Sequence, residues 1–175
     1  MVKILKIISN YLDNITETAG KFASWFTTIL LLIMCYDVFM RYLLNTSSAM
    51  VIELEWHVFS LIFLFGAGYA FKHDRHVRVD VFYSNFSIKK RAIIDLVGTI
   101  LFLIPFCLII IILSIRFASN SFAIMETSPD PGGLPYFFII KSAIPIGFFL
   151  LLLQAVSVLC KCILILSDKT DHIAG

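Results

Sequence analysis

Long apolar stretches alternate with short polar ones along this chain. Four of the stretches, near residues 22–44, 51–71, 92–117 and 136–159, reach the roughly 20 residues that a helix needs to cross a hydrocarbon core about 30 Å thick. None alternates apolar and polar residues as a membrane β-barrel does, and backbone groups inside lipid must be satisfied within the segment. The pattern therefore predicts an all-α membrane protein with four transmembrane helices in one domain, residues 1–175.

A helical period also precedes the first span. Apolar residues recur at Ile4, Ile8, Tyr11 and Ile15, and the other side of the helix is polar. The polar residues on that side are Asn10, Asp13, Asn14 and Glu17. This pattern predicts an N-terminal amphipathic helix that lies at the membrane interface, and it lacks the short apolar core and small-residue cleavage site of a signal peptide.

Lysine and arginine are divided unevenly among the connections. They gather before the first span, between the second and third, and after the fourth. The turn at 45–48 has no charge, and the loop at 119–135 carries Glu126 and Asp130. Because short cytoplasmic loops retain Lys and Arg, we expect both termini in the cytoplasm.

Composition supports a membrane protein over other classes. Hydrophobic residues make up 59% of the chain, charged residues 15%, and the mean hydropathy is +0.93, whereas soluble domains are about 45–50% apolar. The net charge of +2 is small and dispersed, so we expect membrane lipids as surroundings and no nucleic-acid partner.

No residue pattern indicates an enzyme. The four cysteines lie inside or at the end of spans, where buried thiols are expected, and the outer loops lack the Cys pairs that a quinone-linked disulfide-exchange enzyme uses. His57 is the only histidine within a span, which makes a haem between two facing histidines hard to build. We expect no cofactor and no metal in this chain.

Ionisable residues near the ends of the first two spans are candidate subunit contacts, because each costs free energy in lipid, roughly 2.5–3.5 kcal/mol at mid-bilayer. Asp37 and Arg41 are four residues apart and can pair on one helix face. Arg41 can also meet Glu53 across the short turn or contact a partner, or these charges can fix the depth of the helices at the interface. The full candidate set is Asp37, Arg41, Glu53, Glu55, Trp56 and His57.

Two loops complete the set of candidate residues. The charged loop after the second span is expected to fix the cytoplasmic end rather than bind a metal, and its residues are His73, Asp74, Arg75, His76, Arg78 and Asp80. The loop before the fourth span places Asp130, Gly132 and Gly133 among prolines, which predicts an ordered turn that serves as a rigid cap or docking surface.

Several segments together carry a family resemblance over residues 36–154. They are Arg41-Tyr42-Leu43-Leu44-Asn45, Glu53-Leu54-Glu55-Trp56-His57, the run from Lys72 to Tyr83, the run from Ser128 to Tyr136, and Lys141 with the run from Ile144 to Gln154. The chain resembles the DctQ-like small membrane subunit of tripartite ATP-independent periplasmic (TRAP) transporters.

The resemblance implies a four-helix subunit of the bacterial inner membrane with both termini in the cytoplasm. In such systems a DctP-like periplasmic protein captures an organic anion, and a DctM-like large subunit moves it with sodium by an elevator motion. The small subunit is implied to scaffold the large one, without a substrate site or catalytic residue of its own. Sodium would be used by the large partner.

Two other classes remain open from the residues. A membrane anchor of a quinone- or haem-linked redox complex would show as visible absorbance of the purified protein. A stand-alone small exporter would need a carboxylate deeper in the membrane than Asp37. For an importer, the sequence leaves open whether the substrate is a dicarboxylate, a keto acid, a sulfonate or a sugar acid.

Overall fold

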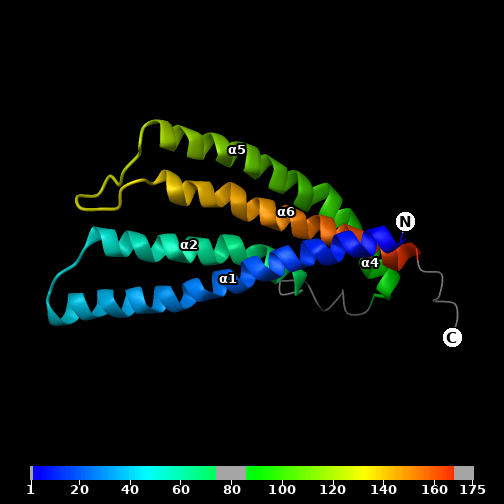
Figure 1. The fold of residues 1–175 in the computed structure, drawn as a ribbon, viewed down its shortest axis with the longest axis horizontal. Coiled ribbons are helices and arrows are strands. Elements are labelled where there is room, and N and C mark those ends of the chain that lie inside the picture. The colour runs from blue at the N-terminus through cyan, green and yellow to red at the C-terminus, as the bar shows by residue number, and fades with distance from the viewer. Residues whose placement is uncertain (1, 74–85, 168–175) are drawn as a thin grey trace.

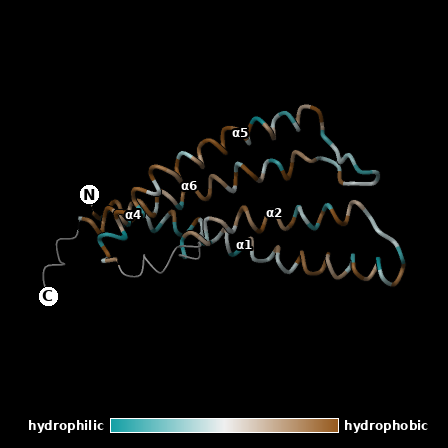
Figure 2. The backbone as a smooth tube through the Cα atoms, turned by 180° about the vertical axis from the view of Figure 1, so that it is seen from behind, coloured by the Kyte–Doolittle hydropathy of each residue, from teal (hydrophilic) through white to brown (hydrophobic). Residues whose placement is uncertain are grey.

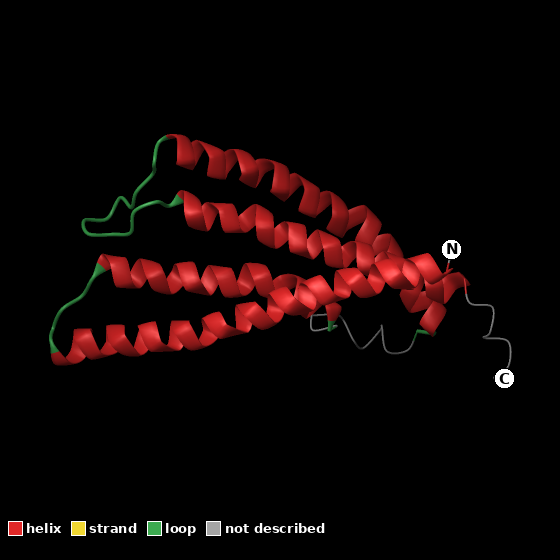
Figure 3. Ribbon diagram, in the orientation of Figure 1, coloured by secondary structure: helices red, strands yellow, loops and turns green. Residues whose placement is uncertain are grey.

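The computed structural model describes residues 2–73 and 86–167, and all regular elements in these ranges are helices (Figure 3). The helices are α1 (Val2–Leu43), α2 (Ala49–Lys72), α4 (Ile88–Gly98), α5 (Ile104–Ala123) and α6 (Phe138–Ser167), with a π-helical turn, η1 (Thr99–Leu103), between α4 and α5. Four rods, one of them made of α4, η1 and α5, are long and apolar enough to cross a membrane. The predicted all-α class with four spans is confirmed.

The N-terminal segment is helical, but it is not a separate helix. No proline interrupts it, and α1 continues unbroken for 42 residues, about 63 Å at 1.5 Å per residue. Its predicted apolar stripe is turned away from the other helices, with Ile4 62% and Tyr11 67% exposed. Its polar side, with Asp13 and Glu17, contacts α6 and the end of α2. The expected interfacial helix is therefore the first part of α1.

Proline accounts for the interruption of the third span. Pro105 has no N–H to donate to the carbonyl of Leu101, and its ring crowds that carbonyl. The π-helical turn η1 precedes this position, and such turns shift the hydrogen-bonding pattern within a helix. The helix thus continues through Pro105 instead of ending there.

The central helix is α6, which contacts α1, α2, α4 and α5. In its most apolar stretch 33% of the residues are buried, against 11% in each of the other three spans. Hydrophobic residues run along most of α5 and α6 (Figure 2). The bundle is therefore open, and most of the surface of α1 and α5 is not covered by this chain.

The helices form two hairpins, α1 with α2 and α5 with α6, which lie together at one end and spread apart at the other (Figure 1). We call the first the terminal end, because α1 begins and α6 ends there, and the second the loop end, because it carries the connections 44–48 and 124–137. Both described chain ends thus lie on one side of the bundle. Assigning that side to the cytoplasm stays a prediction.

Glycine permits the close contacts made by α6 and α1. A side chain at Gly147 of α6 would lie 2.7 Å from Cβ of Leu64 in α2, and one at Gly20 of α1 would overlap the side chain of Tyr69. Small residues let helix backbones approach closely in membranes, where packing replaces the hydrophobic effect between helices. These two glycines therefore hold α2 tightly between its neighbours.

Candidate subunit-contact sites

Glu53 joins α2 to the loop between α5 and α6. Its carboxylate accepts a hydrogen bond from the Ser128 hydroxyl and another, at 2.6 Å, from the backbone N–H of Leu134. Glu53 is only 5% exposed, and a carboxylate removed from water needs such donors. We call Glu53, Ser128 and Leu134 the loop clasp, since they fix the loop to the first hairpin.

The loop is also ordered by its own backbone. The N–H of Ser128 donates to the carbonyl of Leu134, and that of Gly133 donates to the carbonyl of Asp130, both at 3.0 Å. Gly132 has φ 77°, a conformation that favours glycine. A side chain at Gly133 would lie 2.8 Å from Oε1 of Glu53. The two glycines thus have different roles, one in the turn and one in the clasp.

The charges of the first span pair with each other. The Arg41 guanidinium donates to the carboxylate of Asp37 one turn earlier, and Asp37 is 4% exposed. Because Glu53 is held by the loop, the alternative salt bridge between Arg41 and Glu53 is not formed. Glu55 has no hydrogen-bond or ion-pair partner in residues 2–73 or 86–167.

Aromatic side chains surround the start of α2. Nδ1 of His57 lies 2.6 Å from the carbonyl oxygen of Glu53. The ring of Phe137 lies 5.9 Å from that of Trp56 and 5.2 Å from that of His57, in edge-to-face arrangements. The predicted contact residues Trp56 and His57 therefore pack on the second hairpin of this same chain, on the side of α2 that faces α6.

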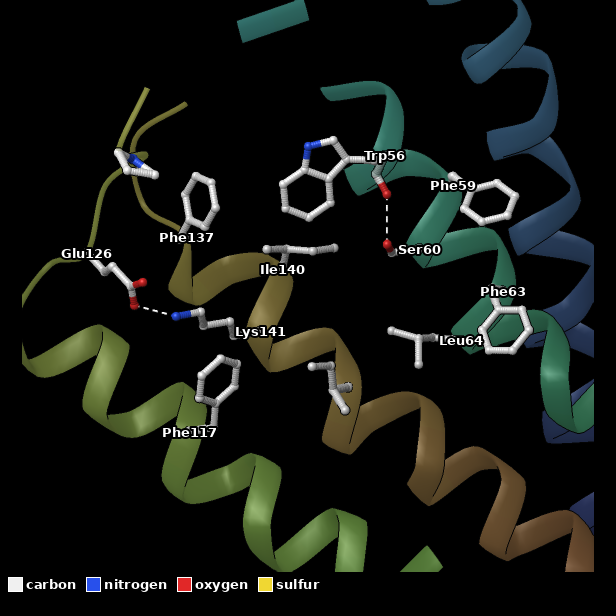
Figure 4. A pocket seen from close by; sticks show the side chains of 12 residues that line it. Trp56, Phe59, Ser60, Phe63, Leu64, Phe117, Glu126, Phe137, Ile140 and Lys141 are labelled. Atoms are coloured by element: carbon white, nitrogen blue, oxygen red, sulfur yellow. Dashed lines mark hydrogen bonds and ion pairs between the residues drawn. The ribbon is translucent and has the colours of Figure 1, made fainter. Parts of the chain in front are cut away.

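An apolar cleft of about 720 Å³ lies among α2, α5 and α6 next to this aromatic group (Figure 4). Its walls include Phe59, Phe63, Phe117 and Ile140. Hydrocarbon surface of this kind accommodates apolar groups and not a carboxylate substrate, whose desolvation would be uncompensated.

The cleft has one ion pair at its edge. Lys141 of α6 pairs with Glu126 of the loop, and its Nζ lies 4.2 Å from the centre of the Phe117 ring (Figure 4). The hydrogen bond from the Lys141 ammonium holds the pKa of Glu126 below its ordinary value. Both charges are therefore compensated within the chain.

A polar network at the terminal end joins α1 to α6. Oδ2 of Asp13 accepts from Lys161 at 2.5 Å, and Oδ1 accepts from Ser157 at 2.5 Å and from the Gln154 amide at 3.1 Å. Gln154 is fully buried, and its own oxygen accepts from the Thr16 hydroxyl at 2.5 Å. Each polar group of this buried set has a partner, which is what keeps such groups inside a protein.

The same network extends to α2 through Glu17. Its carboxylate lies 2.9 Å from Nζ of Lys72 and 2.9 Å from Nε2 of His73. Lys72 also donates to the backbone carbonyl of Asp13 at 3.1 Å. His73, expected in a charged loop, therefore belongs to this terminal network. The other predicted residues of that loop, Asp74, Arg75, His76, Arg78 and Asp80, lie outside the described part of the chain.

The described histidines are far apart. His57 and His73 stand sixteen residues apart along α2, about 24 Å by helical rise. Within the described ranges no group of three or more His, Cys, Asp and Glu side chains is arranged to hold a metal ion, and the cysteines are free thiols. The two histidines do not face each other as paired haem ligands would.

Sequence reasoning missed the terminal network and one cation. Asp13 was expected on the polar side of a surface helix, and Lys161 only as part of the charge count. A signal was present, because Gln154 is a polar residue within an apolar span, where such groups need a partner helix. Arg116 was missed entirely, although it is a charge within the third predicted span.

A comparison with protein families identifies the family of this chain. Residues 30–164 match the family model described as the DctQ component of tripartite ATP-independent periplasmic transporters. No curated protein matched the chain. The family is a transporter component and not an enzyme, and its tripartite systems also contain DctM and DctP components. Since the match covers more than half of the chain, the protein is a multi-pass membrane protein that belongs to the DctQ family of TRAP transporter small membrane subunits.

Proposed function

We propose that this chain is the small permease subunit of a sodium-coupled importer of an organic anion in a bacterial inner membrane, and that it scaffolds a DctM-like large subunit. The large subunit would hold the substrate and sodium and carry out the elevator motion. A DctP-like periplasmic protein would deliver the substrate. This chain contributes a fixed frame.

The observation that best supports this proposal is the open bundle, whose inner face is apolar. The large cleft of the chain is lined by hydrocarbon, and the charges at its edge pair with each other. Sodium-coupled carriers use discontinuous helices around a polar site near the bilayer midplane. The polar clusters described above lie toward the two ends of the bundle instead, so they suit positioning better than permeation.

The exposed apolar surface supports the proposal of a membrane partner whose spans match this bundle in length. On α5, Ile112 and Leu113 are each 57% exposed, and Phe102 in the preceding turn η1 is 74% exposed. Lipid covers such surface in any membrane protein, but α5 packs on the rest of the chain through a narrow stripe of small residues only. An edge helix of this kind gains from a second subunit that continues the bundle.

The loop clasp supports a role for the 124–137 loop in docking. Glu53 and the backbone hydrogen bonds hold the loop in one conformation, and a surface that is ordered before binding loses less entropy when a partner docks. We assign this surface to the binding protein, with the loop on the periplasmic side.

The test is capture of the tagged chain from native membranes in mild detergent, followed by mass spectrometry and an uptake assay with proteoliposomes. We expect a large multi-spanning protein in near-equal amount, and uptake that needs this chain, the large subunit, the binding protein and a sodium gradient. A chain that is recovered alone, or one with visible haem absorbance, would refute the proposal.

A further inference from the structure

Arg116 is an unpaired cation on the outside of α5. Its side chain is exposed, and no hydrogen-bond or ion-pair partner for it occurs in the described residues. It stands seven residues before the end of α5 at Ala123, about 10 Å by helical rise. Exposed Ile109, Ile112 and Leu113 precede it on the same side, so the guanidinium follows an apolar surface.

The direction of Arg116 is fixed by the helix period. Ser114 and Ala118 are buried on the face that α5 turns to α6. Arg116 is two residues from each, which at about 100° per residue places it on the opposite face. It therefore points away from this chain and cannot reach α6 without rotation of the helix.

Unlike Arg116, the other cations of the spans near the loop end have partners within the chain. Arg41 pairs with Asp37, and Lys141 pairs with Glu126. Each carboxylate lies in this chain and offsets the cost of a charge in an apolar environment. Arg116 has the same need, and the exposed face of α5 offers it only the Ser119 hydroxyl and the Asn120 amide one turn further on.

A protein carboxylate suits Arg116 better than a lipid phosphate. Exposed apolar side chains continue beyond it toward the loop, with Phe122 55%, Ile124 73% and Met125 54% exposed. Apolar side chains therefore border Arg116 on both sides along the chain, and the two other cations near this end, Arg41 and Lys141, each pair with a carboxylate. A carboxylate on a transmembrane helix can stand at the same depth and accept two hydrogen bonds from a guanidinium.

We infer that the outer face of α5, with Ile109, Ile112 and Arg116, is the surface on which the large membrane subunit docks, and that Arg116 pairs there with an aspartate or glutamate of that subunit. This inference rests on the proposed function and adds the contact surface. The cleft side of α5, with Phe117, remains turned toward α2.

Arg116→Leu tests the inference, because lipid and an acidic partner respond to it in opposite ways. Against lipid, leucine is at least as well accommodated as arginine. Against a carboxylate, it leaves an unpaired anion in the interface. The control is Thr28→Leu, a polar-to-leucine change at an exposed position of α1. Each variant is captured from membranes that contain the large subunit, and the ratio of the two chains is measured.

We expect Arg116→Leu to lower the captured large subunit about tenfold or more, with Arg116→Lys between it and the wild type and Thr28→Leu unchanged. A circular dichroism melt checks that the variant chain folds. If it does not, a photo-cross-linker at Leu113, which leaves Arg116 intact, should join the two subunits, whereas one at Thr28 should not.

Full capture by Arg116→Leu overturns the inference but leaves the proposed function standing. So does a variant that keeps the large subunit and loses bound anionic phospholipid, since Arg116 would then be a lipid contact. If the wild-type chain itself brings no large subunit, the proposed function fails, and the inference fails with it.

Discussion

The two ends of this bundle are held together by different means. At the terminal end, α1, α2 and α6 share a continuous network from Lys161 through Asp13 and Gln154 to Thr16, extended by Glu17 and Lys72. At the loop end the two hairpins have spread apart, and an apolar cleft of about 720 Å³ lies between them. There the loop clasp is the polar contact between the hairpins.

The terminal end therefore provides stability, and the loop end can adapt to a partner. Buried, fully bonded polar groups fix one arrangement of helices, so the terminal end is expected to keep its geometry whatever surrounds it. Apolar surface at the loop end can pack against lipid or against another helix at similar free energy. The same chain can therefore be rigid at one end and accept a partner at the other.

Asp13→Ala should destabilise the terminal end, and it should have the largest effect of the predicted variants. It removes the acceptor of Lys161, Ser157 and Gln154 and leaves their donors unsatisfied, at a cost of about 2–4 kcal/mol in the free energy of unfolding. Unfolding in mixed micelles, followed by circular dichroism, measures this loss. The control is Asn14→Ala on an exposed position of the same turn, and equal stability of the two variants would show that the network contributes nothing.

Glu53→Ala should act at the loop end alone. Without the carboxylate, the Leu134 N–H loses its acceptor, and we expect amide exchange in the 124–137 loop to become about tenfold faster or more, because local opening no longer breaks a buried bond. Exchange at the terminal end should not change. Glu55→Ala is the matched control, and a similar rate in both variants would refute the role of the clasp.

Glycine substitutions sharpen the comparison within the loop, with a smaller effect. Gly133→Ala puts a methyl group 2.8 Å from Glu53 Oε1 and should loosen the clasp. Gly132→Ala meets open space and costs only the left-handed backbone conformation, about 1 kcal/mol. Proteolysis of the loop should thus be faster for Gly133→Ala than for Gly132→Ala. The reverse order would mean that backbone conformation, and not the clasp, limits loop opening.

The number and position of the helices could be predicted from the sequence, because the length of an apolar run is set by the thickness of the bilayer. The pairing of Asp37 with Arg41 could also be predicted, since it depends only on helical spacing. Local rules of this kind cover the four spans and the ordered turn at Gly132.

The contacts between helices could not be predicted in the same way. Asp13 and Lys161 are 148 residues apart, and nothing in either segment shows which helix the other will meet. Glu53 was expected to pair with Arg41, to contact a partner subunit or to lie at the interface, and the structure shows that the loop holds it instead. Such contacts depend on how hairpins pack, which a period of 3.6 residues does not determine.

The pH dependence of the loop should show the smallest effect. Lys141 holds the pKa of Glu126 below its ordinary value, so the folded state binds a proton less readily than the unfolded one, and this pair stabilises the loop at neutral pH. The contribution is complete above the ordinary pKa of about 4.3 and is lost as the pH falls through the lower folded value. Amide exchange of the loop, corrected for its intrinsic pH dependence, should therefore rise below this point in the wild type and less in Glu126→Gln. Exchange at the terminal end provides the internal reference, and an identical rise in both proteins would place the acid sensitivity in another carboxylate, with Glu53 of the clasp as the first one to replace.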